Sequence, residues 1–319
     1  MTTPKIGVLL TNIGTPAAPN PTAVRQYLKK FLSDRRVVEL PRIAWWPILY
    51  GLILPFRSNS SAKLYKKIWT DNGSPLLVYS KKLADKLQQQ LQLPVALGMH
   101  YSQPSIAQAL SELQSKQVQK IVVIPLYPQY SATTTASAFD AVANTLKKWR
   151  VVPQINLIDQ YSDHPYYIRA LTQSIVNTWQ TRGKAQHLLF SFHGIPKSYA
   201  DAGDPYPVSC IRTAKAIAAA LDLSENEYSV SFQSRLGKSQ WLTPYTDKVL
   251  ASLPKKGLTD IQVICPGFAT DCLETLEEIS IRGKEQFLEA GGQSFYYIPA
   301  LNDQDDHVAM LARMIENSN

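Results

Sequence analysis

Cysteine is scarce in this sequence, and its spacing does not suit a disulfide framework or a metal site. Cys210, Cys265 and Cys272 are the only three cysteines in 319 residues, and no Cys-x-x-Cys pair occurs. This disfavours a disulfide scaffold, a zinc finger and a thioredoxin-type redox site. The start of the chain, MTTPKIGVLL, lacks the pattern of a secretory signal, so we expect a cytoplasmic protein.

Glycine-rich phosphate-binding loops are also absent. The sequence contains no GxGxxG, GxxxxGK[ST] or GxSxG motif, which disfavours a dinucleotide enzyme, a P-loop enzyme and a serine hydrolase. The formal net charge of +8 comes from basic residues placed singly or in short pairs, without a long basic run. No nucleic-acid reader motif accompanies that charge, so we do not expect a nucleic-acid partner.

No apolar run is long enough to span a membrane. The longest, IAWWPILYGLILPF at residues 43–56, is interrupted by Pro47 and Gly51 and is shorter than the ~20 residues of a spanning helix. Two interpretations remain open for it. It could form a buried core helix, or an exposed apolar lip that touches a membrane surface or an apolar ligand. Trp45 and Trp46 suit the second interpretation, because indole combines an apolar body with a polar N–H.

Short apolar runs that alternate with helical patterns predict an α/β fold with parallel sheets. The expected strands form two sets of four: residues 6–10, 95–99, 121–126 and 155–158, then 188–192, 228–232, 261–265 and 295–298. Helical patterns lie between them at residues 21–32, 80–91, 106–113, 168–179, 210–221 and 243–253. We expect two similar domains, residues 1–158 with the lip at about 41–57, and residues 159–319, whose last helix is free to pack back on the first domain.

In such sheets ligands bind beyond the carboxyl ends of the strands, and His193 lies at one of these ends. It follows the apolar run 188–192 and precedes Gly194-Ile195-Pro196. An imidazole there can act as a base or a metal ligand, because its pKa lies near neutrality. The alternative is a histidine that only caps the strand end by hydrogen bonding.

A second signal lies in the segment 271–278, which follows another expected strand. Asp271, Glu274 and Glu278 are spaced i, i+3 and i+7, which predicts three carboxylates on one helical face. Such a stripe can attract a divalent cation and carry protons. A solvated acidic face near a helix N-terminus is the alternative.

Several segments together resemble the ferrochelatase family. The matching blocks are LLTNIGTP (9–16), FLSDRRVVELP (31–41), WWPILYGLILPFR (45–57), YKKIW with GSPL (65–76), PLYPQYSATT (125–134), FSFHGIPKSYADAGDPYP (190–207), FQSRLGKSQWLTPYTD (232–247) and CPGFATDCLETLEEI (265–279). The resemblance implies two Rossmann-like domains, each a four-stranded parallel sheet flanked by helices. It also implies a lyase that inserts Fe(II) into protoporphyrin IX, forming protohaem and releasing two protons.

The resemblance also implies roles for individual residues. His193 and Glu274 match the family's catalytic pair, and which of them takes protons and which takes metal stays open. Both would contact the metal, with Asp271 and Glu278 as its entry path. The implied substrate-binding residues are Ile13, Arg57, Tyr65, Ser74, Tyr130, Trp45 and Trp46, among which Arg57 and Ser74 would hold propionates.

Two positions depart from the family pattern. Cys272 stands where many relatives carry histidine, and His100 stands where relatives often carry arginine. Some relatives hold a [2Fe–2S] cluster, which needs four thiolate ligands. Because no cysteine follows Cys272, we expect no cluster and no permanently bound cofactor, with Fe(II) as a substrate.

Three other functions remain open. They are a related cobalt or nickel chelatase, a non-enzymatic tetrapyrrole or haem carrier, and a two-domain solute-binding protein. The apolar lip favours protoporphyrin over the more carboxylated coproporphyrin, and it predicts peripheral contact with the inner face of the membrane. The sequence leaves open whether the protein is a monomer or a homodimer.

Overall fold

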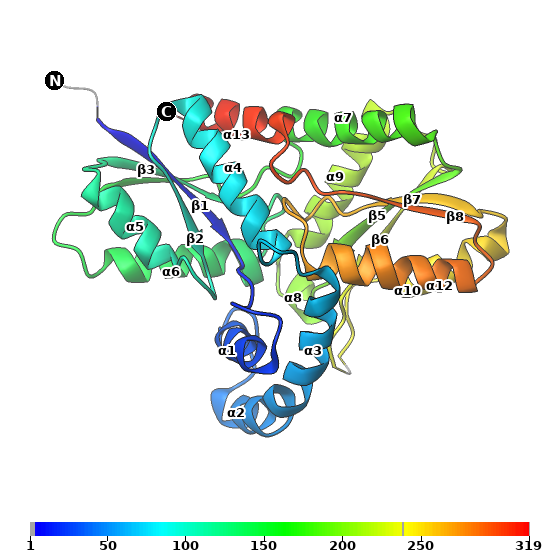
Figure 1. Cartoon of the computed structure of the whole chain (residues 1–319), viewed down its shortest axis with the longest axis horizontal. Helices are drawn as coiled ribbons and strands as arrows, with labels where there is room; N and C mark the ends of the chain where they lie inside the picture. The colour runs from blue at the N-terminus through cyan, green and yellow to red at the C-terminus, as the bar shows by residue number, and fades with distance from the viewer. Residues whose placement is uncertain (1–3, 238, 319) are drawn as a thin grey trace. The chain divides into compact units, whose positions relative to one another are not determined.

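The computed structural model describes residues 4–237 and 239–318, which divide into two compact units. Unit 1 comprises the chain up to Tyr127, Ser131–Gln160 and the residues from Leu311 onward. Unit 2 comprises Pro128–Tyr130 and Tyr161–Met310. Each unit contains one sheet with helices packed against it (Figure 1).

The sheet of unit 1 has four parallel strands in the spatial order β2-β1-β3-β4. Its strands are β1 (Ile6–Asn12), β2 (Val95–Met99), β3 (Lys120–Pro125) and β4 (Gln154–Leu157). In the central strand β1, Val8 pairs with Val95 on one side and with Val122 on the other. Strands β1 to β3 are buried almost throughout, as expected for near-continuous apolar runs covered on both faces.

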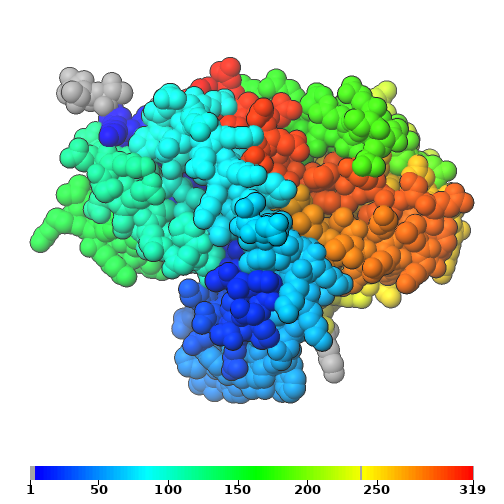
Figure 2. Space-filling view, viewed as in Figure 1, coloured from blue at the N-terminus to red at the C-terminus, as the bar shows by residue number. Residues whose placement is uncertain are grey.

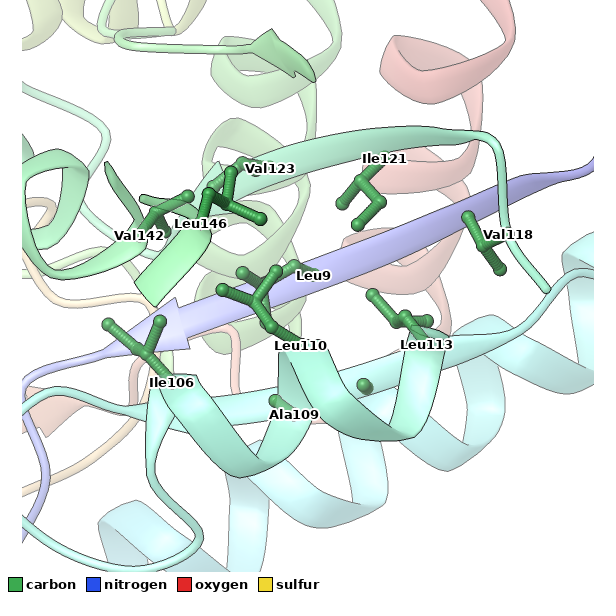
Figure 3. Close-up of a cluster of buried hydrophobic side chains, with 11 residues drawn as sticks. Leu9, Ile106, Ala109, Leu110, Leu113, Val118, Ile121, Val123, Val142 and Leu146 are labelled. Atoms are coloured by element: carbon green, nitrogen blue, oxygen red, sulfur yellow. The ribbon is translucent and has the colours of Figure 1, made fainter. Parts of the chain in front are cut away.

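Helices are the other regular elements of unit 1. They include α1 (Pro21–Leu32), α4 (Pro75–Leu91), α5 (Ile106–Ser115), the π-helix η2 (Ala132–Ala136) and α6 (Ser137–Leu146). Side chains at helical spacing on α5, Ile106, Leu110 and Leu113, pack against Leu9 of β1 and Ile121 of β3 (Figure 3). Ser105 begins α5 with a reciprocal capping box to Gln108, which satisfies backbone donors at the helix start.

The segment that contains the long apolar run is helical from Arg42 to Ile68. It consists of α2 (Arg42–Ile48), the π-helix η1 (Leu49–Ile53) and α3 (Leu54–Ile68). Pro47 lies inside α2, and the wider turn of η1 follows it directly. A π-turn commonly marks a functional position or the site of an insertion in a helix.

Unit 2 repeats the strand order of unit 1. Its parallel sheet has the order β6-β5-β7-β8, and its strands are β5 (His187–His193), β6 (Tyr228–Gln233), β7 (Asp260–Ile264) and β8 (Ser294–Ile298). The helices are α7 (Pro165–Arg182), α8 (Lys197–Asp201), α9 (Tyr206–Ala220), α10 (Thr246–Ser252), the 3₁₀-helix η3 (Pro254–Lys256), α11 (Leu273–Thr275), the π-helix η4 (Leu276–Gly283) and α12 (Lys284–Glu289). The last helix, α13 (Asp305–Asn317), begins in unit 2 and belongs to unit 1 from Leu311 onward.

These observations confirm the predicted fold of two four-stranded parallel sheets flanked by helices. Each of the eight predicted strands is present, with ends shifted by at most two residues. Within the described residues, no helix combines the length and the apolar character that crossing a membrane requires.

Candidate active site

His193 is the last residue of β5, at the carboxyl edge of the unit 2 sheet. Its Nδ1 lies 2.6 Å from the carbonyl oxygen of Gly194, and a carbonyl can only accept. Nδ1 therefore carries the hydrogen, which leaves the lone pair of a neutral imidazole on Nε2. The alternative interpretation, in which His193 only caps the strand end by hydrogen bonding, explains the contact of Nδ1. It does not involve Nε2, which is available for chemistry.

Aromatic rings flank the imidazole of His193. The ring centroids of Trp241 and Phe268 lie 6.5 and 6.4 Å from that of His193. The indole N–H of Trp241 donates to the carbonyl of Leu236 at 2.8 Å, so this ring is itself fixed. The half-buried imidazole thus lies in an apolar setting that restricts its orientation.

The next residue has to be a glycine because the chain passes very close to β6. The N–H of Gly194 donates to the carbonyl of Gln233 at 2.8 Å. A Cβ at position 194 would lie 2.9 Å from that carbonyl oxygen and 3.2 Å from the Trp241 ring. Any side chain would therefore push the end of β5 away from β6 and move His193.

Gln233 connects the strand end of His193 to the turn that carries Glu274. The two residues His193 and Gln233 are paired in the sheet register. The buried amide of Gln233 accepts from Ser191 Oγ at 2.7 Å through Oε1 and donates to the Glu274 carbonyl at 2.8 Å through Nε2. The structure therefore brings the backbones of the two predicted catalytic residues onto one support, which the sequence analysis did not identify.

The prediction that Asp271 shares one helical face with Glu274 and Glu278 is wrong. The helix begins only at Leu273, after the N-cap Cys272, and its first turn passes into the π-helix η4. Asp271 lies before the helix and is 3% exposed. Its carboxylate accepts hydrogen bonds from Thr275, Tyr297 and Asn302, so it points into the fold and away from any shared stripe.

Glu274 and Glu278 differ in what their carboxylates contact. Glu274 lies beside the Cys272 thiol, whose pKa is raised well above its usual range by burial first and by this carboxylate second. Glu278 accepts from the Ser234 backbone N–H at 2.9 Å and from the Ser234 hydroxyl. The bonds to Ser234 tether Glu278 to the loop after β6. Arg282 Nη2 also lies 4.0 Å from Glu278 Oε1.

Glu277 is a buried acid that the sequence analysis did not single out. Its side chain is 1% exposed, and one carboxylate oxygen lies 3.4 Å from the Arg282 guanidinium. In the part of the chain that the structure describes, no three His, Cys, Asp or Glu side chains gather in a way that would hold a metal ion.

The predicted substrate residues of unit 1 lie on several segments of the chain. Ile13 follows β1, and Ser74 is the buried N-cap of α4. Thr15, just after Ile13, donates to the Ser74 hydroxyl at 2.8 Å, which brings these two segments together. Arg57 and Tyr65 both lie on α3, the arginine exposed and the tyrosine buried. Tyr130, in the short segment grouped with unit 2, is half-buried.

Comparison with known proteins places the chain in a family. A model of the family named Ferrochelatase matches residues 5–319. The chain is 49% identical over 312 residues to the Ferrochelatase of Vibrio cholerae and 50% identical over 314 residues to that of Yersinia enterocolitica, with 98% of both chains covered in each alignment. The chain belongs to the ferrochelatase family. This confirms the resemblance, the main functional prediction and the enzyme class, a lyase.

Solved structures agree with the ferrochelatase fold at much lower sequence identity. SirB from Bacillus subtilis with Fe3+ has a TM-score of 0.60 at 10% identity, covering 98% of this chain and 95% of that chain. CbiX, described as the terminal enzyme for biosynthesis of siroheme in denitrifying bacteria, has a TM-score of 0.53 at 14% identity, with 99% of both chains covered. At these identities the likeness shows the fold alone.

Part of the apolar segment of this ferrochelatase-family chain is an exposed face. In Figure 2, helices α1 to α3, in blue, form a lobe that stands out from the cyan body of unit 1. The exposed fractions are 92% for Ile43, 59% for Leu52 and 72% for Phe56. The structure thus supports the interpretation of an exposed lip and excludes a wholly buried core helix.

The two tryptophans of the lip have different environments. Trp46 is 52% exposed, whereas Trp45 is 6% exposed and donates its indole N–H to the Leu32 carbonyl at 2.7 Å. Of the two interpretations left open for this run, the exposed lip therefore holds for Trp46, and the buried core holds for Trp45. The sequence pattern did not distinguish the two because the π-turn and Pro47 break the helical period.

His100, which departs from the pattern of many ferrochelatases, belongs to a polar cluster within unit 1. Its Nε2 lies 3.4 Å from Ser137 Oγ and 3.6 Å from Asp34 Oδ2. Asp34 also accepts from the Tyr101 hydroxyl at 2.8 Å. Burial lowers the pKa of His100, and the charge of Asp34 opposes that shift. The neutral ring thus has partners of its own without the positive charge of an arginine.

Proposed function

We propose that the protein inserts Fe(II) into protoporphyrin IX and releases protohaem. The porphyrin loses two pyrrole N–H protons, and its four nitrogens bind the metal in exchange for the water ligands of the metal. The reaction therefore needs groups that accept protons beside a path by which a divalent cation arrives. His193 and Glu274 supply such groups at the carboxyl edge of one sheet, where open α/β sheets bind their ligands.

The observation that carries the proposal is the free Nε2 of His193. Because Nδ1–H donates to the Gly194 carbonyl, Nε2 holds a lone pair that can accept a pyrrole proton. Glu274 would receive the metal or the second proton, with Glu278 farther along the same acidic segment. Asp271 takes no part in this path, because the lone pairs of its buried carboxylate are engaged by Thr275, Tyr297 and Asn302.

The substrate-binding residues named from the resemblance would hold the macrocycle. Ile13, Tyr65 and Tyr130 would contact its apolar surface, and Arg57 would pair with a propionate. The Ser74 hydroxyl accepts from Thr15, which leaves its own hydrogen to donate to a second propionate. We take protoporphyrin over coproporphyrin as the substrate, because the extensive apolar lip favours the porphyrin with fewer carboxylates.

The deciding experiment is anaerobic incubation with protoporphyrin IX and Fe(II), followed by porphyrin fluorescence and haem absorbance. We expect catalytic haem formation, and His193→Ala should lower kcat by at least about a hundredfold. His187→Gln is the matched control, since His187 lies at the other end of β5 and contacts Ser229 Oγ at 2.8 Å. Tight porphyrin binding without insertion of Fe(II), Co(II) or Ni(II) would favour a carrier. Insertion of Co(II) or Ni(II) but not Fe(II) would favour a different chelatase.

We also propose that the lip docks on the inner face of a membrane containing anionic lipid. The first 70 residues hold 11 of the 33 lysines and arginines but only two of the 25 acidic residues. Exposed lysines on α1 and α3, such as Lys29 and Lys63, belong to the same lobe as the apolar face. Each such cation near an anionic surface contributes about 1 kcal/mol to binding, in addition to the burial of Ile43, Trp46 and Phe56 in the interface.

Vesicle sedimentation tests this docking. Binding should be clear with vesicles that contain an anionic phospholipid, weak with zwitterionic vesicles, and reduced by salt. Trp46→Ser should weaken binding, whereas Val151→Ser should not, although Val151 is 76% exposed, because it precedes β4 outside the lobe. Equal binding of both variants and wild type would contradict the proposal.

The thiols give no reason to add an iron–sulfur cluster. Cys210, Cys265 and Cys272 are all buried and unpaired, and burial raises the pKa of each well above its usual range. We expect the purified protein to contain no acid-labile sulfide and no visible cluster absorbance. Detection of either would overturn this part of the proposal.

A further inference from the structure

We infer that Asn302 and Asp271 form a buried brace that positions Glu274, so that both are positioning residues for metal insertion. This inference rests on the role proposed above for Glu274. It replaces the expected role of Asp271 in metal entry with a mechanical one. Asn302 lies in the loop between β8 and α13, 28 residues beyond Glu274 in the sequence.

The brace consists of two reciprocal hydrogen bonds. Asn302 Nδ2 donates to Asp271 Oδ2 at 2.7 Å, and the backbone N–H of Asp271 donates to Asn302 Oδ1 at 2.8 Å. Asn302 has a left-handed backbone with φ of 49°, a conformation that Asn and Asp adopt more readily than most residues. Its own N–H donates to the Ala269 carbonyl at 3.0 Å, so the turn before the acidic segment is held at two points.

The other carboxylate oxygen of Asp271 extends the brace to the helix that carries Glu274. Asp271 Oδ1 accepts from the Tyr297 hydroxyl at 2.7 Å and from Thr275 Oγ1 at 2.8 Å. Thr275 follows Glu274 directly, and Gln233 holds the Glu274 carbonyl. The backbone of Glu274 is thus fixed on both sides, by β6 through Gln233 and by β8 through Asp271.

The hydrogen-bond polarity of this network is strict. Asp271 accepts hydrogen bonds at both carboxylate oxygens. The Asn302 amide has one possible orientation, because rotating it by 180° would place its NH2 group against the Asp271 backbone N–H, which is also a donor. Asp271→Asn therefore places an NH2 group against another donor, either the Asn302 amide or the two hydroxyls. Asn302→Asp makes the opposite error, because two carboxylates then face each other.

The exchanged pair Asp271→Asn with Asn302→Asp restores every donor and acceptor. The amide at position 271 accepts from Tyr297 and Thr275 and donates to the new carboxylate at position 302. That carboxylate still accepts from the backbone N–H of residue 271. A pair of isosteric changes that are harmful singly and compatible together is the signature of a direct coupling.

The experiment compares wild type, the two single variants and the exchanged pair in the anaerobic chelation assay, with porphyrin affinity and thermal unfolding measured on each. We expect each single variant to lose about tenfold or more in kcat with porphyrin Kd changed less than about twofold, and the pair to recover most of kcat. Asn177→Asp is the matched control, because Asn177 lies on α7 and bonds only to Gln173 among the described contacts of its side chain.

Each outcome decides the inference. An exchanged pair no more active than the worse single variant would overturn it, as would single variants that unfold more easily yet keep wild-type kcat. If the single variants do not fold, Tyr297→Phe removes one donor to Asp271 alone and should lower kcat without changing porphyrin Kd; unchanged kcat would refute the brace. Wild type and His193→Ala, run in parallel, separate this result from a failure of the proposed function. In such a failure wild type forms no haem, or His193→Ala is as active as wild type.

Discussion

Acid should destabilise this protein through His307, a buried histidine on α13. The side chain is 1% exposed, and Nδ1–H donates to the Asn302 carbonyl with an Nδ1–O distance of 2.6 Å. Burial lowers the pKa of His307 from 6.5 to about 4, against the opposing effect of the Asn302 carbonyl. The folded protein therefore keeps this ring neutral at a pH where the unfolded chain has already bound a proton.

The sign of the effect follows from proton uptake. Between pH 6.5 and about 4 the unfolded state binds more protons than the folded state, so the free energy of unfolding falls as the pH falls. The stability contribution is complete above pH 6.5 and is lost progressively down to pH 4. A shift of this size corresponds to roughly 3 kcal/mol in total, of which about 2 kcal/mol is lost by pH 5.

Two substitutions isolate this contribution. His307→Asn places an amide N–H near the former Nδ1–H, and His307→Gln removes that donor, but neither can titrate. Both variants should be less stable than wild type at pH 8, because a buried ring is replaced by a smaller group. Both should nevertheless lose less stability than wild type between pH 7 and pH 4.5, by about 2–3 kcal/mol.

Urea unfolding followed by circular dichroism at several pH values measures this difference. The informative quantity is the change in unfolding free energy with pH for each protein, which does not depend on the offset at pH 8. If wild type and both variants lose stability in parallel, His307 is not held neutral by the fold and the reasoning is wrong. If only His307→Asn differs from wild type, the hydrogen bond matters and the titration does not.

Further substitutions test local contacts. Trp45→Ala should lower the free energy of unfolding by about 4 kcal/mol, whereas Trp46→Ala should change it by less than about 1 kcal/mol; urea unfolding distinguishes them, and equal losses would contradict the buried position of Trp45. Gly194→Ala should lower kcat for chelation about tenfold or more, because its Cβ would lie 2.9 Å from the Gln233 carbonyl; a fully active variant would show that β5 need not lie so close to β6. Asn20→Ala removes the N-cap bond to Ala23 and should cost about 1 kcal/mol in thermal or urea unfolding, with no loss refuting the cap.

The fold could be predicted because the strands are near-continuous apolar runs of the right length. Residues 95–99 and 228–232 illustrate this, since the sequence placed their starts within one residue of β2 and β6. The helical segment 42–68 was harder to predict. Its two prolines, its glycine and its π-turn disturb the 3.6-residue period from which helices are inferred. The exposed and buried residues of the lip could therefore not be separated by spacing.

The candidate site also contains some residues that could be predicted from the sequence and others that could not. His193 could be found because it is a titratable residue at the carboxyl end of a buried strand, where ligands bind. Attention to the polar end of β6 would also have found Gln233. The role of Asp271 could not be found from spacing. An i, i+3, i+7 pattern assumes one continuous α-helix, whereas the chain begins its helix after Asp271 and then widens into a π-helix.

The wider turn changes what the acidic segment can do. A π-helix advances by more residues per turn than an α-helix, so Glu277 and Glu278 do not occupy the positions that an α-helical wheel gives them. Glu277 is buried against Arg282, and Glu278 is tied to Ser234. Of the acids in this segment, Glu274 is the one whose backbone is held from two sheet strands while its carboxylate lies beside a neutral thiol. These hydrogen bonds fix the position of the Glu274 backbone. A group that must contact a rigid macrocycle at a set distance needs such a fixed position.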